Sequence, residues 1–135
     1  LERALEREPD DGPVLEELAR ALIERARAGN VPGPLMRAIE LLERAGRDER
    51  TAYSARTGAV YAWLVRGRRD LATQQAGVLL PSVDRIDPRT RIELAAYLAV
   101  IRIFDGDREG GEAELRRLGE LAPGHPALAR ARSLL

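Results

Sequence analysis

The sequence predicts an all-α protein built from a row of antiparallel helix hairpins. Hydrophobic residues make up 44% of the 135 residues but aromatic residues only 4%, so alanine and leucine, which favour helices, must build the core. Prolines and glycines divide the chain into segments of helical length, and no segment alternates with a period of two. The first helices of successive pairs start near Val14, Arg50 and Pro88, at intervals of about 36 and 38 residues. One hairpin per period is typical of an α-solenoid.

The first predicted hairpin follows a break at residues 9–13. Asp11 is a candidate helix cap, and Pro13 suits the first turn. The following segment places apolar residues on one helical stripe, which predicts a helix over residues 14–28. The sequence GNVPG ends this helix, and Pro34 opens a second helix over residues 34–46.

The second predicted hairpin begins with a helix over residues 50–66. Its later half, residues 59–65, is apolar on every side and should be buried on most faces. Gly67 ends this helix. A fourth helix runs to about Leu80, where Pro81 permits a kink or an early end.

The third predicted hairpin starts with Asp87 as the cap and Pro88 at the first helical position. The centre of this fifth helix, residues 94–101, is again apolar all round. A sixth helix covers residues 108–121, and a short seventh helix follows Pro126. Together these segments predict about three hairpins and a C-terminal capping helix.

The stretch from Gly106 to Pro126 resembles the second half of a tetratricopeptide repeat (TPR). Gly106 and Asp107 match the turn of that repeat, Gly111 the first small position and Leu115 the large apolar one; Pro123 follows Gly106 by seventeen positions, as in the family. Small residues of this kind let two antiparallel helices approach closely.

Other parts of the chain resemble the same repeat in a degenerate form. Gly67 matches the turn in the middle repeat, Ala72 and Ala76 take contact positions of its second helix, and Trp63 stands where the family packs a tyrosine. The first repeat keeps the second-helix spacing but carries about four extra residues in its turn, at residues 30–34. The first helices lack the usual tryptophan and glycine of the family, and Leu118 replaces an expected alanine. A divergent α-solenoid or an irregular bundle is the alternative.

The resemblance implies one TPR-like helical repeat domain over residues 1–135, arranged as a right-handed α-solenoid. Ala4 lies five residues before Pro9, as the last small residue does in the family, so residues 1–9 are expected to be the tail of an upstream repeat. The remaining boundaries are residues 10–46 for the first repeat, 47–84 for the second, 85–123 for the third and 124–135 for the capping helix.

The resemblance also implies that the first helix of each repeat lines a concave groove that binds a peptide. The expected partner-binding residues are Ile23, Ser54, Thr57, Tyr61, Glu93, Tyr97 and Val100, with Ala19 and Ala96 beside them. Positions that grip a C-terminal carboxylate in one TPR subclass carry no matching residues here, so that mode is not predicted. Tyr61 and Tyr97 offer the area and hydroxyl groups of binding hot spots, although packing between helices explains them equally well.

Composition excludes several kinds of chemistry. The 22 basic residues balance the 22 acidic ones, so the basic surplus of a nucleic-acid binder is missing, and no direct nucleic-acid partner is expected. The absence of lysine and cysteine excludes a Schiff base, a Walker lysine and thiolate chemistry. His125, the only histidine, is expected to be a solvated turn residue, and carboxylates such as Glu16 are expected to pair with arginines on solvated helix faces. No catalytic residue, metal site or cofactor is therefore predicted.

These observations favour a non-enzymatic scaffold module that binds a protein or peptide in its groove. The alternative is a helical sensor or regulatory segment of a larger bacterial transcription regulator or signalling protein; a neighbouring helix-turn-helix or NTPase would favour it. The bacterial origin is inferred from the exclusive use of arginine, which suits a GC-rich coding background, and Leu1 in place of a methionine suggests a piece of a longer chain. No apolar run is long enough for a membrane span, so a cytoplasmic location is expected. Exposed solenoid ends would also allow homodimerisation.

Overall fold

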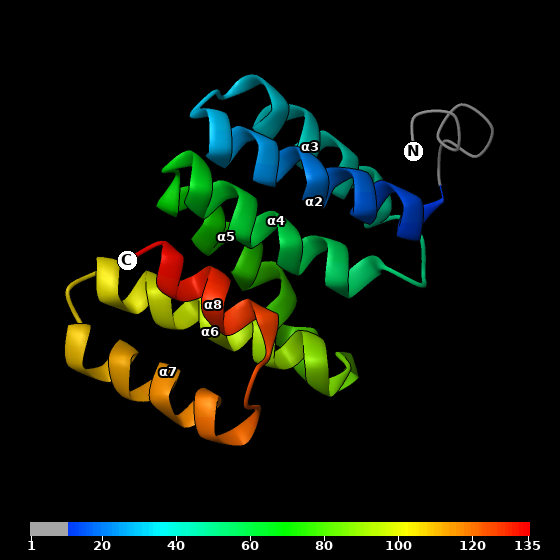
Figure 1. The fold of residues 1–135 in the computed structure, drawn as a ribbon. Helices are drawn as coiled ribbons and strands as arrows, with labels where there is room; N and C mark the ends of the chain where they lie inside the picture. Colours follow the sequence, from blue (N-terminus) through cyan, green and yellow to red (C-terminus); the bar gives the residue numbers. More distant parts are fainter. Residues whose placement is uncertain (1–10) are drawn as a thin grey trace.

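The computed structural model describes residues 11–135, and over this range it consists of helices joined by turns (Figure 1). It contains seven α-helices and one 3-10 helix, and no strand occurs among the described residues, which confirms the all-α prediction. The elements are α2 (Gly12–Gly29), α3 (Gly33–Ala45), α4 (Ala52–Arg66), α5 (Arg69–Leu79), η1 (Leu80–Arg85), α6 (Pro88–Phe104), α7 (Arg108–Leu121) and α8 (Pro126–Ser133). The predicted tail at residues 1–9 lies outside the described range.

The helix ends follow the punctuation of the sequence. The Asp87 carboxylate accepts a hydrogen bond from the backbone N–H of Thr90 at 3.0 Å, which confirms the predicted cap of α6. Gly67 ends α4 in the left-handed conformation, with φ of 82°, which glycine adopts without strain. After Pro81 the chain does not leave the helical conformation but continues as η1, because the fixed φ of proline suits the first turn of a helical segment.

Consecutive helices pack as hairpins, α2 with α3, α4 with α5 and α6 with α7. Both helices of the first hairpin contact α4, and both helices of the second contact α6. The last helix, α8, packs against α6 and α7 and crosses the same side of the molecule as α2 and α4 (Figure 1). Helices α2, α4, α6 and α8 thus share one side.

Glycine at position 111 allows α7 to approach α6 closely. A Cβ atom built at Gly111 would lie 2.6 Å from the carbonyl oxygen of Ala99 and would also overlap the side chain of Ile103. Since Ala99 and Ile103 both belong to α6, the small residue expected at this position fixes the spacing of the hairpin.

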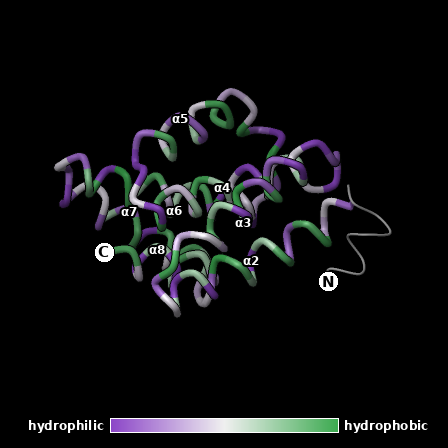
Figure 2. The backbone as a smooth tube through the Cα atoms, turned by 90° about the horizontal axis from the view of Figure 1, so that it is seen from above, coloured by the Kyte–Doolittle hydropathy of each residue, from purple (hydrophilic) through white to green (hydrophobic). Residues whose placement is uncertain are grey.

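The core is centred on α4 and α6, as the apolar segments at residues 59–65 and 94–101 predicted. Viewed from above, green segments run through the middle of the molecule at α4 and α6 and along α2, and purple is prominent in α7 at the edge (Figure 2). Val60 and Val100 are fully buried. Thr57 is also fully buried, and its hydroxyl donates a hydrogen bond to the carbonyl of Tyr53 at 2.8 Å, which satisfies the polar group inside the core.

Candidate functional site

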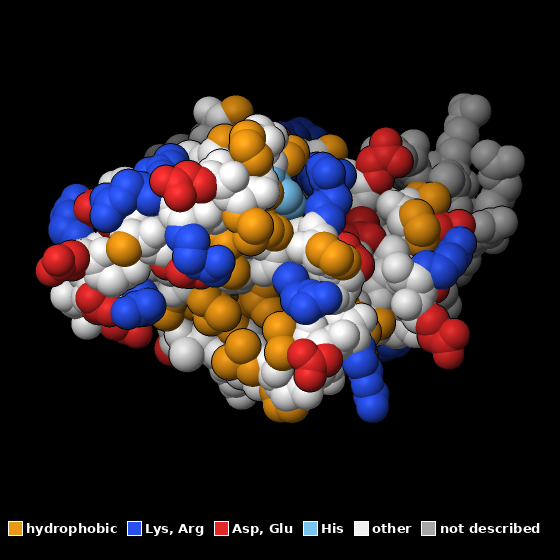
Figure 3. Space-filling view, turned by 90° about the horizontal axis from the view of Figure 1, so that it is seen from below, with side chains coloured by type: hydrophobic (Ala, Val, Ile, Leu, Met, Phe, Trp, Pro, Cys, Tyr) orange, Lys and Arg blue, Asp and Glu red, His pale blue; other side chains and the backbone are white. Residues whose placement is uncertain are grey.

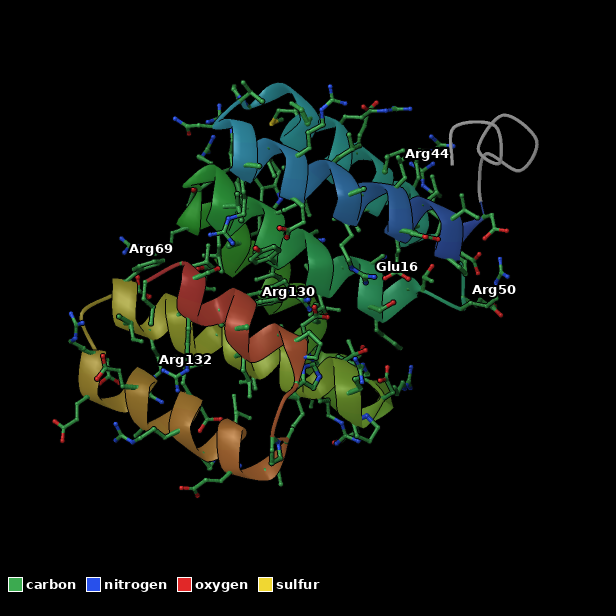
Figure 4. All side chains as sticks on the ribbon, in the orientation of Figure 1. Glu16, Arg44, Arg50, Arg69, Arg130 and Arg132 are labelled. Carbon is green, nitrogen blue, oxygen red and sulfur yellow. The ribbon has the colours of Figure 1, made fainter. Side chains whose placement is uncertain are left out.

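A groove of about 510 Å³ opens on the side that α2, α4, α6 and α8 share. Helix α2 forms one wall, α8 the other, and α4 and α6 the floor. In Figure 4, Glu16 lies between α2 and α4, and Arg130 lies between α8 and α4. The lining residues are Glu16, Arg20, Ile23, Glu24, Leu42, Ser54, Gly58, Tyr61, Arg89, Thr90, Glu93, Tyr97, His125, Pro126 and Arg130.

Two stacked tyrosines lie at the base of the groove. The ring centroids of Tyr61 and Tyr97 are 5.3 Å apart, with planes inclined by 21°. Their side chains are almost completely buried, with 3% of Tyr61 and none of Tyr97 exposed. The rings therefore pack between α4 and α6, and only their hydroxyl ends face the groove.

The Tyr97 hydroxyl belongs to a network that joins α6 to α8. It donates a hydrogen bond to Glu93 Oε2 at 2.9 Å and accepts one from Arg130 Nε at 3.1 Å. Arg130 Nη2 lies 2.9 Å from the same Glu93 oxygen, and the guanidinium carbon lies 6.0 Å from the centre of the Tyr61 ring. Burial, helped by the charge of Glu93, raises the pKa of Tyr97 well above its usual range, so the phenol stays neutral.

A second arginine joins the opposite wall to the same floor. Arg27 of α2 donates from Nη1 to the Tyr61 hydroxyl at 2.6 Å and to Ser133 Oγ of α8 at 2.7 Å. Arg27 therefore connects α2 and α8, the two walls of the groove, to each other and to the stacked tyrosines.

Glu16 brings a half-buried carboxylate into the groove. It faces Ser54 of α4 across the groove, and the Ser54 hydroxyl donates a hydrogen bond to the carbonyl oxygen of Thr51 at 3.4 Å. Burial raises the pKa of Glu16 above its ordinary value, although the nearby Ser54 hydroxyl and the positive charge of Arg20 oppose the rise. The negative charges of Glu93 and Asp48 add to it. Glu16 is therefore less solvated than expected, since its side chain is half-buried where it lines the groove.

His125 lies in the turn before α8, as expected, but it is half-buried and its side chain caps that helix. Its Nδ1 accepts a hydrogen bond from the backbone N–H of Ala127 at 3.1 Å, and Nε2 lies 3.0 Å from the carbonyl oxygen of Arg89. This pair of contacts requires the neutral tautomer with the proton on Nε2. The imidazole thus fixes the start of α8 against the start of α6. Seen from below, basic, acidic and hydrophobic side chains are interspersed over the surface (Figure 3).

The structure brings five of the seven expected partner-binding residues to the groove: Ile23, Ser54, Tyr61, Glu93 and Tyr97. Thr57 and Val100 lie in the core, where a segment bound in the groove does not reach them. Only Ser54 and Glu93 among the five are half-exposed; the other three are buried.

Sequence reasoning missed the walls of the groove. Glu16, Arg20 and Glu24 recur on one face of α2, and this spacing was a signal that all three would face the same neighbour. The contribution of α8, through His125 and Arg130, had no such local signal, since it depends on how a helix packs against α6, more than thirty residues earlier.

Within residues 11–135, no group of three histidine, cysteine or acidic side chains is placed to hold a metal ion. None of the described helices is long and apolar enough to cross a membrane. Comparison with protein-family models, curated proteins and solved structures finds no match for the chain.

Proposed function

We propose that the protein is a non-enzymatic interaction module that holds a peptide or helical segment of another protein in the groove between α2 and α8. The observation that carries this proposal is a groove of about 510 Å³ with the Tyr61–Tyr97 pair at its base. Hydrogen bonds from Arg27 of α2 to Tyr61 and to Ser133 of α8 connect its two walls. A preformed groove binds a segment without first ordering its own walls, which lowers the cost of association.

The arrangement of the hairpins supports the proposal. Each hairpin packs on the next in chain order, and the first helix of each contributes to the groove. We infer a right-handed, TPR-like α-solenoid with α8 at its C-terminal end. In such a solenoid one helix of each pair lines a continuous inner surface suited to an extended or helical ligand.

A randomised peptide library displayed on phage tests the proposal when it is selected against the purified 135-residue chain. Because the chain contains no cysteine, a Ser54→Cys variant carries one thiol on the groove floor. Enriched peptides should slow the alkylation of Cys at position 54 by a maleimide. The matched control is Gln74→Cys, at an exposed position of α5 outside the groove, whose alkylation rate should not change.

Two results would contradict the proposed function. Failure to enrich any peptide over several rounds of selection would contradict the proposal that the protein binds a peptide. Enriched peptides that protect position 74 and leave position 54 reactive would place binding on the outer helices.

A further inference from the structure

We propose that Ser133 is a phosphorylation site and that Arg27 binds the phosphate, which attaches α8 more firmly to α2. The inference goes beyond the proposed function, because it concerns how α8 is held and does not depend on what the groove binds. It follows from the contact between an exposed hydroxyl and a half-buried guanidinium that has no acidic partner.

Ser133 carries its hydroxyl at the exposed end of α8. It is the last residue of that helix and is exposed to solvent. Its Oγ accepts a hydrogen bond from Arg27 Nη1 at 2.7 Å and donates one to the carbonyl oxygen of Arg130 at 2.5 Å. Nη2 of Arg27 lies 3.3 Å from the carbonyl oxygen of Ser133. The guanidinium of Arg27 therefore faces the oxygen to which a phosphoryl group is attached.

Arg27 is hydrogen bonded to neutral acceptors alone. These acceptors are the hydroxyl of Tyr61 and the hydroxyl and carbonyl oxygens of Ser133. None of the ion pairs formed within residues 11–135 includes Arg27, although the residue is half-buried. Taking a charged group partly out of water costs free energy unless an opposite charge lies close to it. An anion placed at Oγ of Ser133 would supply that charge.

A phosphate suits this position better than a single carboxylate. It carries roughly −1.5 to −2 charges near neutral pH and three strong acceptor oxygens. A guanidinium binds two such oxygens at once through parallel N–H groups. Both terminal nitrogens of Arg27 already point at Ser133, so this geometry needs no rearrangement of α2.

Ser133 differs from the other serines and threonines of the chain. Three threonines are buried, and the two remaining serines are half-buried. Thr73 of α5 is exposed, but within residues 11–135 no arginine side chain is hydrogen bonded to it. Ser133 therefore combines exposure with a contact to a guanidinium.

Two arginines precede Ser133 and give a kinase a basic segment to recognise. Arg130 and Arg132 lie three positions and one position before it, and both belong to α8 (Figure 4). Arg130 is paired with Glu93 when α8 is docked, so it can reach acidic residues of a kinase only when the end of α8 has detached. Phosphorylation then acts on the detached helix and favours its return.

The transfer requires a separate protein kinase and a nucleoside triphosphate. Oγ of Ser133 forms a bond to the γ-phosphorus, and the bond between that phosphorus and the oxygen that bridges it to the β-phosphate breaks. The hydroxyl proton passes to a carboxylate of the kinase, and the nucleoside diphosphate leaves.

The attached phosphate has two opposing effects on α8. A negative charge at the last residue of a helix is unfavourable because it opposes the helix dipole. A charge-assisted contact with both nitrogens of Arg27 is stronger than the dipole effect of one charge at an exposed helix end. The phosphate should therefore hold α8 on α2 rather than unfold it.

Hydrogen exchange of the 135-residue chain with phosphoserine incorporated at position 133 tests the contact with Arg27. The amides of α8 should exchange about fivefold more slowly than in the unmodified chain, since hydrogen bonds to charged groups are stronger than those between neutral groups. In Arg27→Met the same phosphate should speed exchange, because only the unfavourable dipole effect remains. Arg25→Met, at an exposed position of the same helix, should retain the slowing.

A second measurement keeps the test valid if Arg27→Met releases α8 altogether. The phosphorus-31 resonance of the phosphoserine should titrate at a lower pH in the wild type than in Arg27→Lys, which keeps the charge but loses the paired N–H groups. Faster exchange of α8 in the phosphorylated wild type, or equal titration of the phosphate in both chains, would overturn binding by Arg27.

The acceptor role of Ser133 is tested on the unmodified chain with Mg-ATP and a purified arginine-directed serine kinase, the catalytic subunit of cAMP-dependent protein kinase. Mass spectrometry should find the phosphate on Ser133, and Ser133→Ala should incorporate none. Phosphate found mainly on another residue, or no incorporation into the wild type, would overturn the site. Neither result bears on peptide binding in the groove, so this inference and the proposed function can fail separately.

Discussion

Arg27 Nη1 donates a hydrogen bond to Ser133 Oγ at 2.7 Å and thereby joins helices that are 106 positions apart in the sequence. The same nitrogen donates to the Tyr61 hydroxyl at 2.6 Å. One guanidinium therefore connects α2, α4 and α8, which are two walls and part of the floor of the groove. The width of the groove depends on this contact and on the ion pair between Arg130 and Glu93 at the other side of α8.

Replacement of Arg27 by methionine should loosen α8. Methionine keeps most of the aliphatic stem but cannot donate to Tyr61 or Ser133, so we expect a loss of about 1–3 kcal/mol in the free energy of unfolding. Urea unfolding measures this loss, and hydrogen exchange should show faster exchange in α8 than in α6. Arg25→Met, at an exposed position of the same helix, is the control and should change stability by less than about 0.5 kcal/mol. Equal effects of both variants would contradict the connection.

Replacement of Arg130 by methionine should be destabilising because it leaves two acceptors behind. Glu93 and Tyr97 would lose a shared donor in a region where the Glu93 side chain is only 18% exposed. We expect a loss of about 1–3 kcal/mol, less than for a fully buried ion pair. Glu93→Gln in the Arg130→Met background should recover part of this loss, since it removes the uncompensated charge. Arg132→Met, an exposed position of α8, serves as the control in the same urea titration.

Glu16→Gln should stabilise the unbound protein at neutral pH. The pKa of Glu16 is higher in the folded chain than its ordinary value, so the folded state binds the proton more tightly than the unfolded state. The contribution of Glu16 is therefore most favourable below its ordinary pKa, and stability falls as the pH rises from that value through the folded pKa. Glutamine mimics the protonated form, so the difference in melting temperature should be positive at pH 7 and shrink towards pH 3. A variant that is less stable than the wild type at pH 7 would contradict this account of Glu16.

Two glycines of α7 should respond oppositely to the same substitution. Gly111→Ala forces a methyl group against the Ala99 carbonyl, and overpacking of this kind costs about 1–3 kcal/mol. Gly119→Ala places its methyl group where no atom lies within 4 Å, and should stabilise the helix by roughly 0.5–1 kcal/mol. Thermal unfolding followed by circular dichroism distinguishes the two signs. Stabilisation by both substitutions would show that α6 and α7 do not pack as closely as described.

The helices were predictable because their signals are local. Asp87 and Pro88 mark the start of α6, and Gly67 marks the end of α4, through backbone conformations and caps that depend on a few neighbouring residues. The segment after Pro81 was less predictable, since proline is compatible both with ending a helix and with starting a helical turn.

The site was predictable only in part, because its walls depend on contacts between distant segments. The TPR-like spacing led to Ser54 and Glu93, which repeat along the first helices of hairpins. The same pattern left open whether Tyr61 and Tyr97 are exposed groove residues or pack between helices. In the structure the two rings stack on each other and are buried. Nothing local to α8 indicates that Arg130 reaches Glu93, which lies 37 positions earlier.

Amide chemical-shift changes on addition of a selected peptide to the ¹⁵N-labelled chain test the groove most directly. If the peptide binds in the groove, the largest changes should cluster on the groove side of α2, α4 and α6, at Glu16, Ser54, Gly58 and Glu93, and at the start of α8. Changes confined to α3, α5 and α7 would contradict it, because those helices form the opposite side of each hairpin.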